Sequence, residues 1–356
     1  MSALLIGNIQ ETKKKTDSFL DWMRGKGKGL IIIHDHPDPD CLASAMALQH
    51  LLTMKLNRDT VVALSGAISR SENIAMAREL KIHLTPLTEL TIDDFSMICM
   101  LDTQPGTGNN SLPPNVKVDL VIDHHPIRES SRKCRWIDIR EEYGATATIL
   151  YEYLVAQDVS IGTKLATALF YAIKSETQDL GREAGKADRN AYLSLFPLTN
   201  KKLLCEIVHP RLPQSHFQYL HLALKNAMIF ENLLVIKMGE ITTPEVVAEM
   251  ADYLVRLEGI DVALSMGRLH GALIMSMRTT RNDLNAGEIM RKLVSGQGTA
   301  GGHGMTAGGR IDPVSPSPVA FHCLEENLTQ QLLADLKTPP GTPRALIHTG
   351  NERIRS

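Results

Sequence analysis

Short apolar runs, each the length of one β-strand, alternate with helix-like segments through the first part of this sequence. The runs are GLIII at 29–33, TVVAL at 60–64, FSMICML at 95–101 and VDLVI at 118–122. The helix-like segments are 9–28, 41–56, 71–82, 144–157 and 162–175. Strands that alternate with helices predict a parallel sheet covered on both faces.

The chain of 356 residues is long enough for two domains. A proline-interrupted, helix-like stretch at 197–230 reads as a connector. After it come a strand at 232–239, a helix at 244–259, a strand pair turning near Leu269–Gly271, a helix at 285–296, a glycine-rich segment at 296–311 and a last helix at 318–335. We therefore expect an α/β protein with a larger parallel-sheet domain at 1–196, the connector at 197–230 and a smaller α/β domain at 231–336. The tail at 337–356 is expected to be loose or draped over the surface.

Charge and cysteine content exclude several classes of protein. The 38 Lys and Arg against 40 Asp and Glu give a formal net charge of -2, which argues against a basic surface for long nucleic acid but leaves room for a small anionic ligand. The five cysteines form no CxxC pair, so we expect neither a zinc knuckle nor a disulfide framework. Without a secretory signal or a run of about 20 apolar residues, a cytoplasmic protein away from membranes is expected.

Metal-ligating side chains follow three of the predicted strands at the point where each strand ends. The residues are His34, Asp38 and Asp40 after the first strand, Asp102 after the third, and Asp123, His124 and His125 at the fourth. In an open parallel sheet, ligands bind beyond the carboxyl ends of the strands, so these loops should meet at one edge. A single strand-end Asp is more often a turn or cap residue. The ordered set of three loops is hard to explain that way.

The residue types of this set indicate the kind of metal. Carboxylates with a few imidazoles and no cysteine suit Mn²⁺ or Mg²⁺, and there are more of them than one ion needs. Two ions about 3.5–4 Å apart can share a bridging carboxylate and a bridging water. Such a pair activates water for in-line attack on phosphorus. We therefore expect two divalent ions, with Mn²⁺ favoured and Mg²⁺ or Co²⁺ as alternatives.

The ordered motifs resemble those of the DHH phosphoesterase family. HDHPDPD, LDT and DHHP are similar to the first three family motifs, and GGHGMTAGG is similar to the glycine-rich motif of the DHH-associated C-terminal domain, so the resemblance spans about residues 28–335. The two-domain length is closest to the nanoRNase/pAp-phosphatase-like and dinucleotide phosphodiesterase branch. The resemblance implies an active site in the cleft between a cleaving N-terminal domain and a nucleotide-recognising C-terminal domain. It also makes a homodimer a fair expectation.

The resemblance assigns roles residue by residue. His34 and Asp38 would hold the first metal, Asp40 and His124 the second, and Asp102 would bridge both. His125 would face the substrate phosphate, and Asp123 would orient the histidines.

The fourth family motif departs from its usual form in this chain. The family has a helix followed by Gly-Ile-x-x-Asp-Thr, whereas this sequence reads AIKSETQDLGR. Glu176 stands where Asp is expected, and its extra methylene leaves it able to reach the metal. Asp179 is the substitute candidate, although its position slightly favours a turn residue at the end of a helix. The sequence leaves this choice open.

The second domain carries candidate recognition residues. GQGTAG formally matches G-x-G-x-x-G, but no strand is predicted before it, so a Rossmann motif is rejected. Gly301, Gly302 and His303 would instead form a loop whose backbone approaches a phosphate or base. Arg278 would supply a guanidinium for a phosphate, and a solvated Arg at a strand end is the equally good alternative.

The sequence as a whole favours a two-metal phosphodiesterase that cleaves short oligoribonucleotides, or linear or cyclic dinucleotides, to nucleoside monophosphates. Two alternatives remain within the enzymes: a phosphatase acting on pAp, and a polyphosphate or pyrophosphate hydrolase. A non-catalytic nucleotide sensor is the alternative from another class, and Glu176 is the feature that favours it. The expected partner is a small nucleotide or short oligonucleotide, with no long nucleic acid and no membrane.

Overall fold

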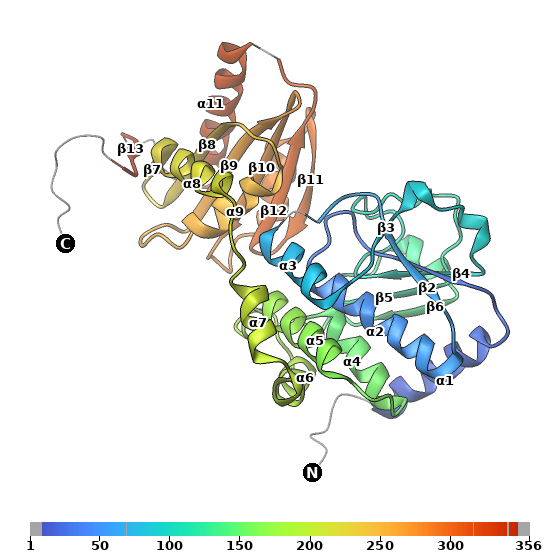
Figure 1. Ribbon diagram of the computed structural model, residues 1–356. Helices are drawn as coiled ribbons and strands as arrows, with labels where there is room; N and C mark the ends of the chain where they lie inside the picture. The colour runs from blue at the N-terminus through green and yellow to red at the C-terminus, as the bar shows by residue number, and fades with distance from the viewer. Residues whose placement is uncertain (1–8, 69, 316, 340–341, 348–356) are drawn as a thin grey trace. The chain divides into compact units, whose positions relative to one another are not determined.

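The computed structural model describes residues 9–68, 70–315, 317–339 and 342–347. The chain divides into two compact units, Met1–Arg211 and Leu212–Ser356 (Figure 1). The predicted connector at 197–230 is divided between them. Within the described ranges, none of the helices combines the length and apolarity that a membrane span requires.

The first unit contains a six-stranded sheet in which every neighbouring pair is parallel, as predicted. Its spatial order is β3-β2-β1-β4-β5-β6. The strands are β1 (Gly29–Ile32), β2 (Thr60–Leu64), β3 (Thr85–Pro86), β4 (Met97–Leu101), β5 (Leu120–Asp123) and β6 (Trp136–Ile139). From β1 the chain moves outward to β2 and β3, then returns to β4 on the other side of β1. The strand order therefore reverses between β1 and β4, which is where open α/β sheets bind ligands.

Helices cover one face of this sheet (Figure 1). The helices of the unit are α1 (Ile9–Met23), α2 (Pro39–Leu56), α3 (Ser71–Leu80), α4 (Thr146–Ala156), α5 (Thr163–Glu176), α6 (Lys186–Leu195) and α7 (Lys201–Val208). Alternate strand residues such as Ile31 and Ile122 pack against α1, α2, α4 and α5 in one core. α2 begins sharply because Asp38 caps it and Pro39 occupies its first turn, and it ends at Asn57 in the left-handed region.

The second face of the sheet is also covered, but by connecting segments in place of the helices that a doubly wound sheet usually has. Leu30, Ile98 and Val121 pack there beneath residues of the 87–95 and 112–118 connections. In the described chain, the first of these connections contains only the short 3₁₀ turns η1 (Leu87–Glu89) and η2 (Ile92–Asp94). These connections contain too little helix to form a second helical layer.

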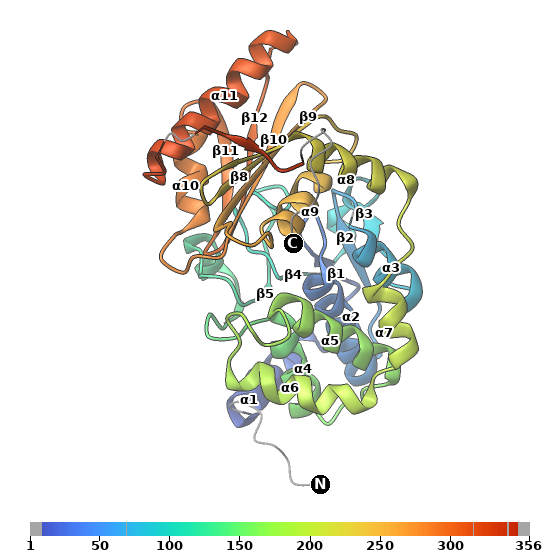
Figure 2. The ribbon, with the colours of Figure 1, turned by 90° about the vertical axis from the view of Figure 1, so that its left-hand side faces the viewer.

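The second unit is a mixed seven-stranded sheet with helices on both faces (Figure 2). Its order is β11-β12-β10-β9-β8-β7-β13, and only β8 and β9 pair in parallel. The strands are β7 (Ala227–Phe230), β8 (Leu233–Glu240), β9 (Val262–Leu269), β10 (Ala272–Thr279), β11 (Gly298–His303), β12 (Thr306–Ile311) and β13 (Arg344–Ala345). α8 (Gln214–Asn226) and α9 (Glu245–Leu254) cover one face; α10 (Ala286–Leu293) and α11 (Pro318–Asp335) cover the other.

One prediction for the second unit needs correction. The glycine-rich segment was predicted to be a loop, but it forms the hairpin β11–β12, because β12 completes the edge of the sheet beside β10. Within the tail, Arg344–Ala345 pairs with β7 at the edge of the sheet, so this part of the tail lies against the second unit. Residues 348–356 lie outside the described residues.

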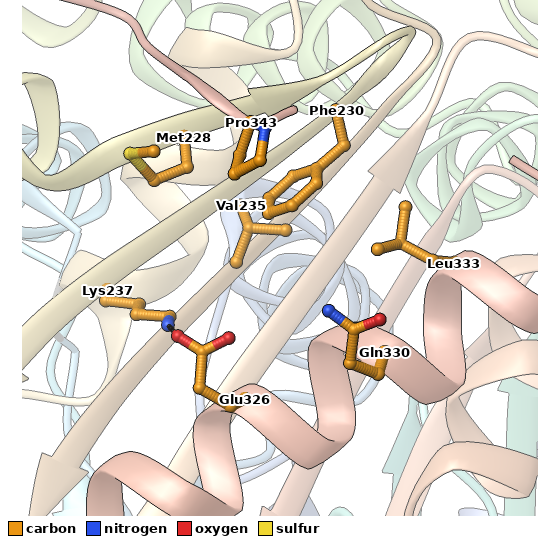
Figure 3. A pocket seen from close by; sticks show the side chains of 8 residues that line it. All are labelled: Met228, Phe230, Val235, Lys237, Glu326, Gln330, Leu333 and Pro343. Atoms are coloured by element: carbon orange, nitrogen blue, oxygen red, sulfur yellow. Dashed lines mark hydrogen bonds and ion pairs between the residues drawn. The ribbon is translucent and has the colours of Figure 1, made fainter. Parts of the chain in front are cut away.

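A cavity of about 180 Å³ lies in the second unit between the sheet and α11 (Figure 3). Met228, Phe230 and Val235 form an apolar wall, and Lys237 pairs with Glu326 at the opposite side. The lysine is already neutralised by its neighbour, and the lining contains none of the predicted metal or recognition residues. This cavity is therefore not the predicted site.

Candidate metal centre

The predicted ligands meet at the carboxyl ends of β1, β4 and β5. Asp102 lies between two histidines and turns one oxygen toward each. Its Oδ2 is 3.7 Å from His34 Nε2, and its Oδ1 is 3.7 Å from His124 Nε2. His34 Nε2 is also 3.5 Å from Asp38 Oδ2, and His124 Nε2 is 3.9 Å from Asp40 Oδ2. The cluster therefore consists of two half-sites that share one carboxylate.

The two carboxylates of the DPD segment are fixed by helix N-termini. Asp38 Oδ1 accepts hydrogen bonds from the backbone N–H groups of Asp40 and Cys41, which leaves Oδ2 facing His34. The Asp40 carboxylate is buried and accepts from the N–H groups of Thr146 and Ala147, both at 2.7 Å, at the start of α4. Helix N-termini bind anions, so these hydrogen bonds orient both carboxylates. Burial and the charge of Asp102 nevertheless raise the pKa of Asp40 well above its usual range.

Asp102 adopts a backbone conformation that few residues other than glycine take. Its φ is 57°, and its side chain is 3% exposed. Asp102 Oδ1 accepts a hydrogen bond from Thr146 Oγ1 at 2.9 Å. A non-glycine residue in the left-handed region costs about 1–3 kcal/mol, and such strain persists where the surroundings enforce it. The strain turns this carboxylate inward at the end of β4, between the two histidines.

Each ring of the DHH segment is oriented by a different acceptor. Asp123 Oδ1 accepts from His125 Nδ1 at 2.9 Å, and Asp123 Oδ2 accepts from Gln104 Nε2 at 2.8 Å. His124 is held by another group, since its Nδ1 donates to the Tyr143 carbonyl at 3.1 Å. Gln104 and the Tyr143 carbonyl were not predicted. A backbone carbonyl has no signature in sequence. Gln104 directly follows the LDT motif, and this position is the signal that could have identified it.

The state of His124 provides a test of whether a metal ion fits here. Because Nδ1 carries the proton donated to Tyr143, Nε2 carries a lone pair. That Nε2 atom is buried and has no hydrogen-bond partner within the described part of the chain. It faces oxygens of Asp102 and Asp40, which are acceptors as well. Converging acceptors without a donor fit a divalent cation.

The pKa values of the cluster reflect the same excess of acceptors. Burial, with the charge of Asp38, raises the pKa of Asp102 to about 7. Burial alone would lower the pKa of His34, but the carboxylates of Asp38 and Asp102 raise it to about 9. Burial would also lower the pKa of His125, but its hydrogen bond to Asp123 and the charge of Asp102 raise that pKa to about 10. In the metal-free chain, these raised pKa values mean that Asp102, His34 and His125 bind protons more tightly, because the clustered carboxylates favour positive charge.

The two candidates of the fourth motif lie in different surroundings. Glu176 is the last residue of α5, and burial and the charges of Asp38 and Asp102 raise its pKa, while His124 and Arg182 lower it. Asp179 is 57% exposed, forms an ion pair with Lys174 and accepts from the Tyr192 hydroxyl at 3.0 Å. Glu176 therefore faces the cluster, and Asp179 is bound to surface partners.

Asp35 ties three loops of the site together. Its Oδ1 accepts from the Ser65 N–H at 3.0 Å, and its Oδ2 accepts from Ser111 Oγ at 2.6 Å. At Gly66, a Cβ would lie 1.8 Å from the Asp35 carbonyl oxygen, so the loop after β2 approaches too closely for any side chain. Asp35, whose role the sequence left open, thus fixes the loop that carries His34 and Asp38.

Cys41 lies beside the first half-site. Its ligand atom is within 4.8 Å of those of His34 and Asp38. The thiol is fully buried and donates to the Asp38 carbonyl oxygen at 3.4 Å, and burial raises its pKa. These contacts indicate a structural role for Cys41 in the first turn of α2.

In the second unit, the predicted recognition residues belong to regular strands. Arg278 is 12% exposed: it pairs with Asp252, and its Nη1 donates to Ser276 Oγ at 2.7 Å. Gly301 and Gly302 lie in β11, the edge strand. A Cβ at Gly302, whose φ is 121°, would lie 2.4 Å from the Thr306 carbonyl oxygen. His303 ends β11, and its side chain lies outside the described residues.

Comparisons with known proteins agree with the architecture and with the motifs. The model of the DHH family, N-terminal domain, matches residues 28–173, and that of the DHHA1 domain matches residues 230–330. An uncharacterised protein of Methanocaldococcus jannaschii is 34% identical over 286 residues, which cover 79% of this chain and 57% of that protein. A probable manganese-dependent inorganic pyrophosphatase of Oceanobacillus iheyensis is 28% identical over 150 residues, which cover 42% of this chain and 48% of that protein.

Among solved structures, an exopolyphosphatase-related protein from Bacteroides fragilis superposes with a TM-score of 0.71. The two are 16% identical, and the match covers 92% of this chain and 99% of that one. At this identity the likeness concerns the fold. The chain spans about half the length of the curated relatives that it matches.

Proposed function

Because this chain belongs to the DHH family and carries both its N-terminal domain and a DHHA1 domain, we propose that it is a metal-dependent phosphodiesterase. Its substrates are short oligoribonucleotides or dinucleotides, which it cleaves to nucleoside monophosphates. The observation that carries the proposal is the position of Asp102, which turns one carboxylate oxygen toward each of two half-sites.

The donors divide between the two half-sites. His34, Asp38 and Asp102 would hold one ion; Asp40, Asp102, His124 and Glu176 would hold the other. When bound, two divalent ions, Mn²⁺ before Mg²⁺ or Co²⁺, lower the pKa of water and screen the charge that develops on phosphorus. The side chains themselves supply fixed geometry, since Asp38, Asp40 and His124 are each already held by backbone groups.

His125 is proposed to bind the substrate phosphate. Its side chain is 38% exposed, which makes it more open than His34 or His124. Its Nδ1 is held by Asp123, so the ring orientation is set before substrate arrives. A ring fixed in this way can donate from Nε2 to a phosphate oxygen.

A hydrolase for pyrophosphate or polyphosphate is the second candidate. It is favoured by the likeness of 150 residues of this chain to a probable manganese-dependent inorganic pyrophosphatase. The DHHA1 domain and its glycine-rich edge strand favour a substrate with more to recognise than phosphate alone. All five cysteines are free thiols, which fits action in the reducing cytoplasm.

A substrate panel separates the candidates. The Mn²⁺-supplemented protein should be incubated with pApA, pGpG, cyclic dinucleotides, pAp and pyrophosphate, with an EDTA-treated sample as the control. We expect nucleoside monophosphates from a dinucleotide, no release of orthophosphate from pAp or pyrophosphate, and no reaction after EDTA. Phosphate release from pAp or pyrophosphate would instead support the corresponding alternative. Tight binding of a nucleotide without any turnover would support a sensor.

Arg278 provides a test of substrate recognition by the second unit. We propose that its guanidinium, held in place by Asp252, binds a substrate phosphate, so Arg278→Ala should raise KM for dinucleotides about tenfold and leave kcat within about twofold. Asp252→Asn keeps the guanidinium and serves as the matched control, with a much smaller change in KM. Equal KM values in Arg278→Ala and the wild type would show that the ion pair is only structural.

A further inference from the structure

Asp188 is a buried carboxylate whose role the proposed chemistry does not explain. It lies in the first turn of α6 and is fully buried. Its Oδ2 accepts from the N–H groups of Gly144 at 2.8 Å and Gly185 at 2.7 Å, and its Oδ1 accepts from Thr148 Oγ1 at 2.6 Å. No Lys or Arg of the described chain forms an ion pair with it. The bond from Gly185 caps the start of α6. The bonds from Gly144 and Thr148 reach outside this helix and compensate the cost of burying the carboxylate.

The donors that Asp188 binds bracket a short segment that supports the metal centre. Gly144 follows Tyr143, whose carbonyl orients His124. Thr146 and Ala147 then bind the Asp40 carboxylate, and the Thr146 hydroxyl binds Asp102. Thr148 completes the segment. Asp188 therefore forms hydrogen bonds to both ends of the segment 144–148.

The same segment contacts the turn that follows Glu176. A Cβ at Gly144 would lie 2.7 Å from Thr177 Cγ2 and 2.8 Å from the Glu183 carbonyl oxygen. A Cβ at Gly185 would lie 2.9 Å from the Glu142 carbonyl oxygen. The two backbones thus approach each other too closely for side chains, and Asp188 supplies the hydrogen bonds across the contact. The position of Glu176 relative to His124 depends on this contact.

We infer that Asp188 is a positioning residue for the second half-site: it joins residues 143–148, which hold His124, Asp40 and Asp102, to the turn that follows Glu176. The inference rests on the proposed two-metal function. The first half-site has a support of its own, since Asp35 anchors the loop with His34 and Asp38. Because the segment also binds Asp102, which both half-sites share, the loss of Asp188 should weaken the second ion most and the other ion much less.

Mn²⁺ titration followed by electron paramagnetic resonance tests this inference, because it counts bound and free ions without reference to turnover. In Asp188→Ala, the second-site ion should bind roughly 10- to 100-fold more weakly, the range found when partners of metal ligands are removed, while the other ion is weakened much less. Asp188→Asn should restore binding to within a few-fold. Its carbonyl can accept from both N–H groups, and its amide can donate to the Thr148 hydroxyl.

Asp35→Ala is the matched comparison and should weaken the other ion. The inference is overturned if Asp188→Ala leaves both affinities unchanged or weakens both equally, as a general loss of stability would do. Circular dichroism of the metal-free variants separates misfolding from loss of metal. If Asp188→Ala does not fold, Thr148→Val tests the same inference, because it removes one hydrogen bond to Asp188. This variant should bind the second-site ion a few-fold more weakly. An unchanged affinity would contradict the inference. A wild type that binds only one Mn²⁺ refutes the two-metal function itself.

Discussion

Replacing Asp102 by alanine is expected to lower turnover by a factor on the order of a thousand or more. Asp102 faces both His34 and His124, so its loss removes a donor from both half-sites together. A metal pair supplies several kcal/mol of transition-state stabilisation, and about 4 kcal/mol corresponds to a thousandfold in rate.

The fold should survive this change. Burial and the charge of Asp38 raise the pKa of Asp102 to about 7, so its ionised form destabilises the metal-free fold above that pH. Asp102→Asn, which tolerates the left-handed backbone better than Ala, should therefore match or exceed the wild type in melting temperature at pH 8, yet be about as inactive as Asp102→Ala.

The measurement pairs steady-state hydrolysis of the best dinucleotide with metal analysis and thermal melting. Asp119→Ala is a suitable control, because Asp119 precedes β5 at the far end of the strand and accepts from the Ile98 N–H. It should affect stability and leave turnover near the wild type. Near-wild-type activity in Asp102→Ala with unchanged metal content would contradict the two-metal assignment.

The parallel sheet and the ligands at its edge were predictable from sequence because both depend on local patterns. Apolar runs of strand length ending in Asp or His place the side chains at strand ends, and parallel order brings those ends together. Asp102 lies 3.7 Å from both His34 and His124 for this reason. The predicted last helix likewise begins and ends where the structure has α11, since Ser317 caps it.

The groups that hold the ligands were not predictable, because most of them are backbone atoms. The Tyr143 carbonyl and the N–H groups of Thr146 and Ala147 orient His124 and Asp40. Any residue supplies such atoms, so no letter of the sequence marks them. The pairing of Arg278 with Asp252 was missed for a different reason: it joins β10 to α9, and only the tertiary fold brings the two together.

The glycine-rich hairpin shows tertiary structure overriding local preference. Glycine is a poor strand former, so residues 298–311 read as a loop. In the structure β12 pairs with β10 across its whole length, and β11 pairs with β12. The neighbouring strand supplies the pairing that the sequence alone does not favour. At Gly309 a Cβ would lie 2.8 Å from Met290 Sδ, so any larger residue would force the Met290 side chain of α10 to shift.

Glu176→Gln is expected to weaken the second-site ion at least tenfold and to lower turnover by a similar or larger factor, whereas Asp179→Asn should change both by less than about twofold. Glu176 interacts electrostatically with Asp38, His124 and Asp102, and its side chain is 26% exposed. Asp179 pairs with Lys174 and Tyr192 at the surface. The two carboxylates are three residues apart and point to different surroundings.

The geometry of the turn makes this comparison a fair one. Glu176 Oε1 is 3.2 Å from Arg182 Nη2, and the carbonyl of Gln can accept the same hydrogen bond, so the substitution removes charge and leaves the turn in place. Gln178, Asp179 and Leu180 all have positive φ. Asn tolerates that conformation as Asp does, so Asp179→Asn preserves the backbone equally well.

Mn²⁺ titration and turnover of both variants give the answer together. A larger loss in Asp179→Asn would mean that the fourth motif is shifted by three residues and that the turn rearranges when metal binds. If neither variant differs from the wild type, the second ion has only Asp40, Asp102 and His124 as protein ligands. A site with that deficit binds its second ion weakly, and nucleotide binding without turnover then becomes the better account of this chain.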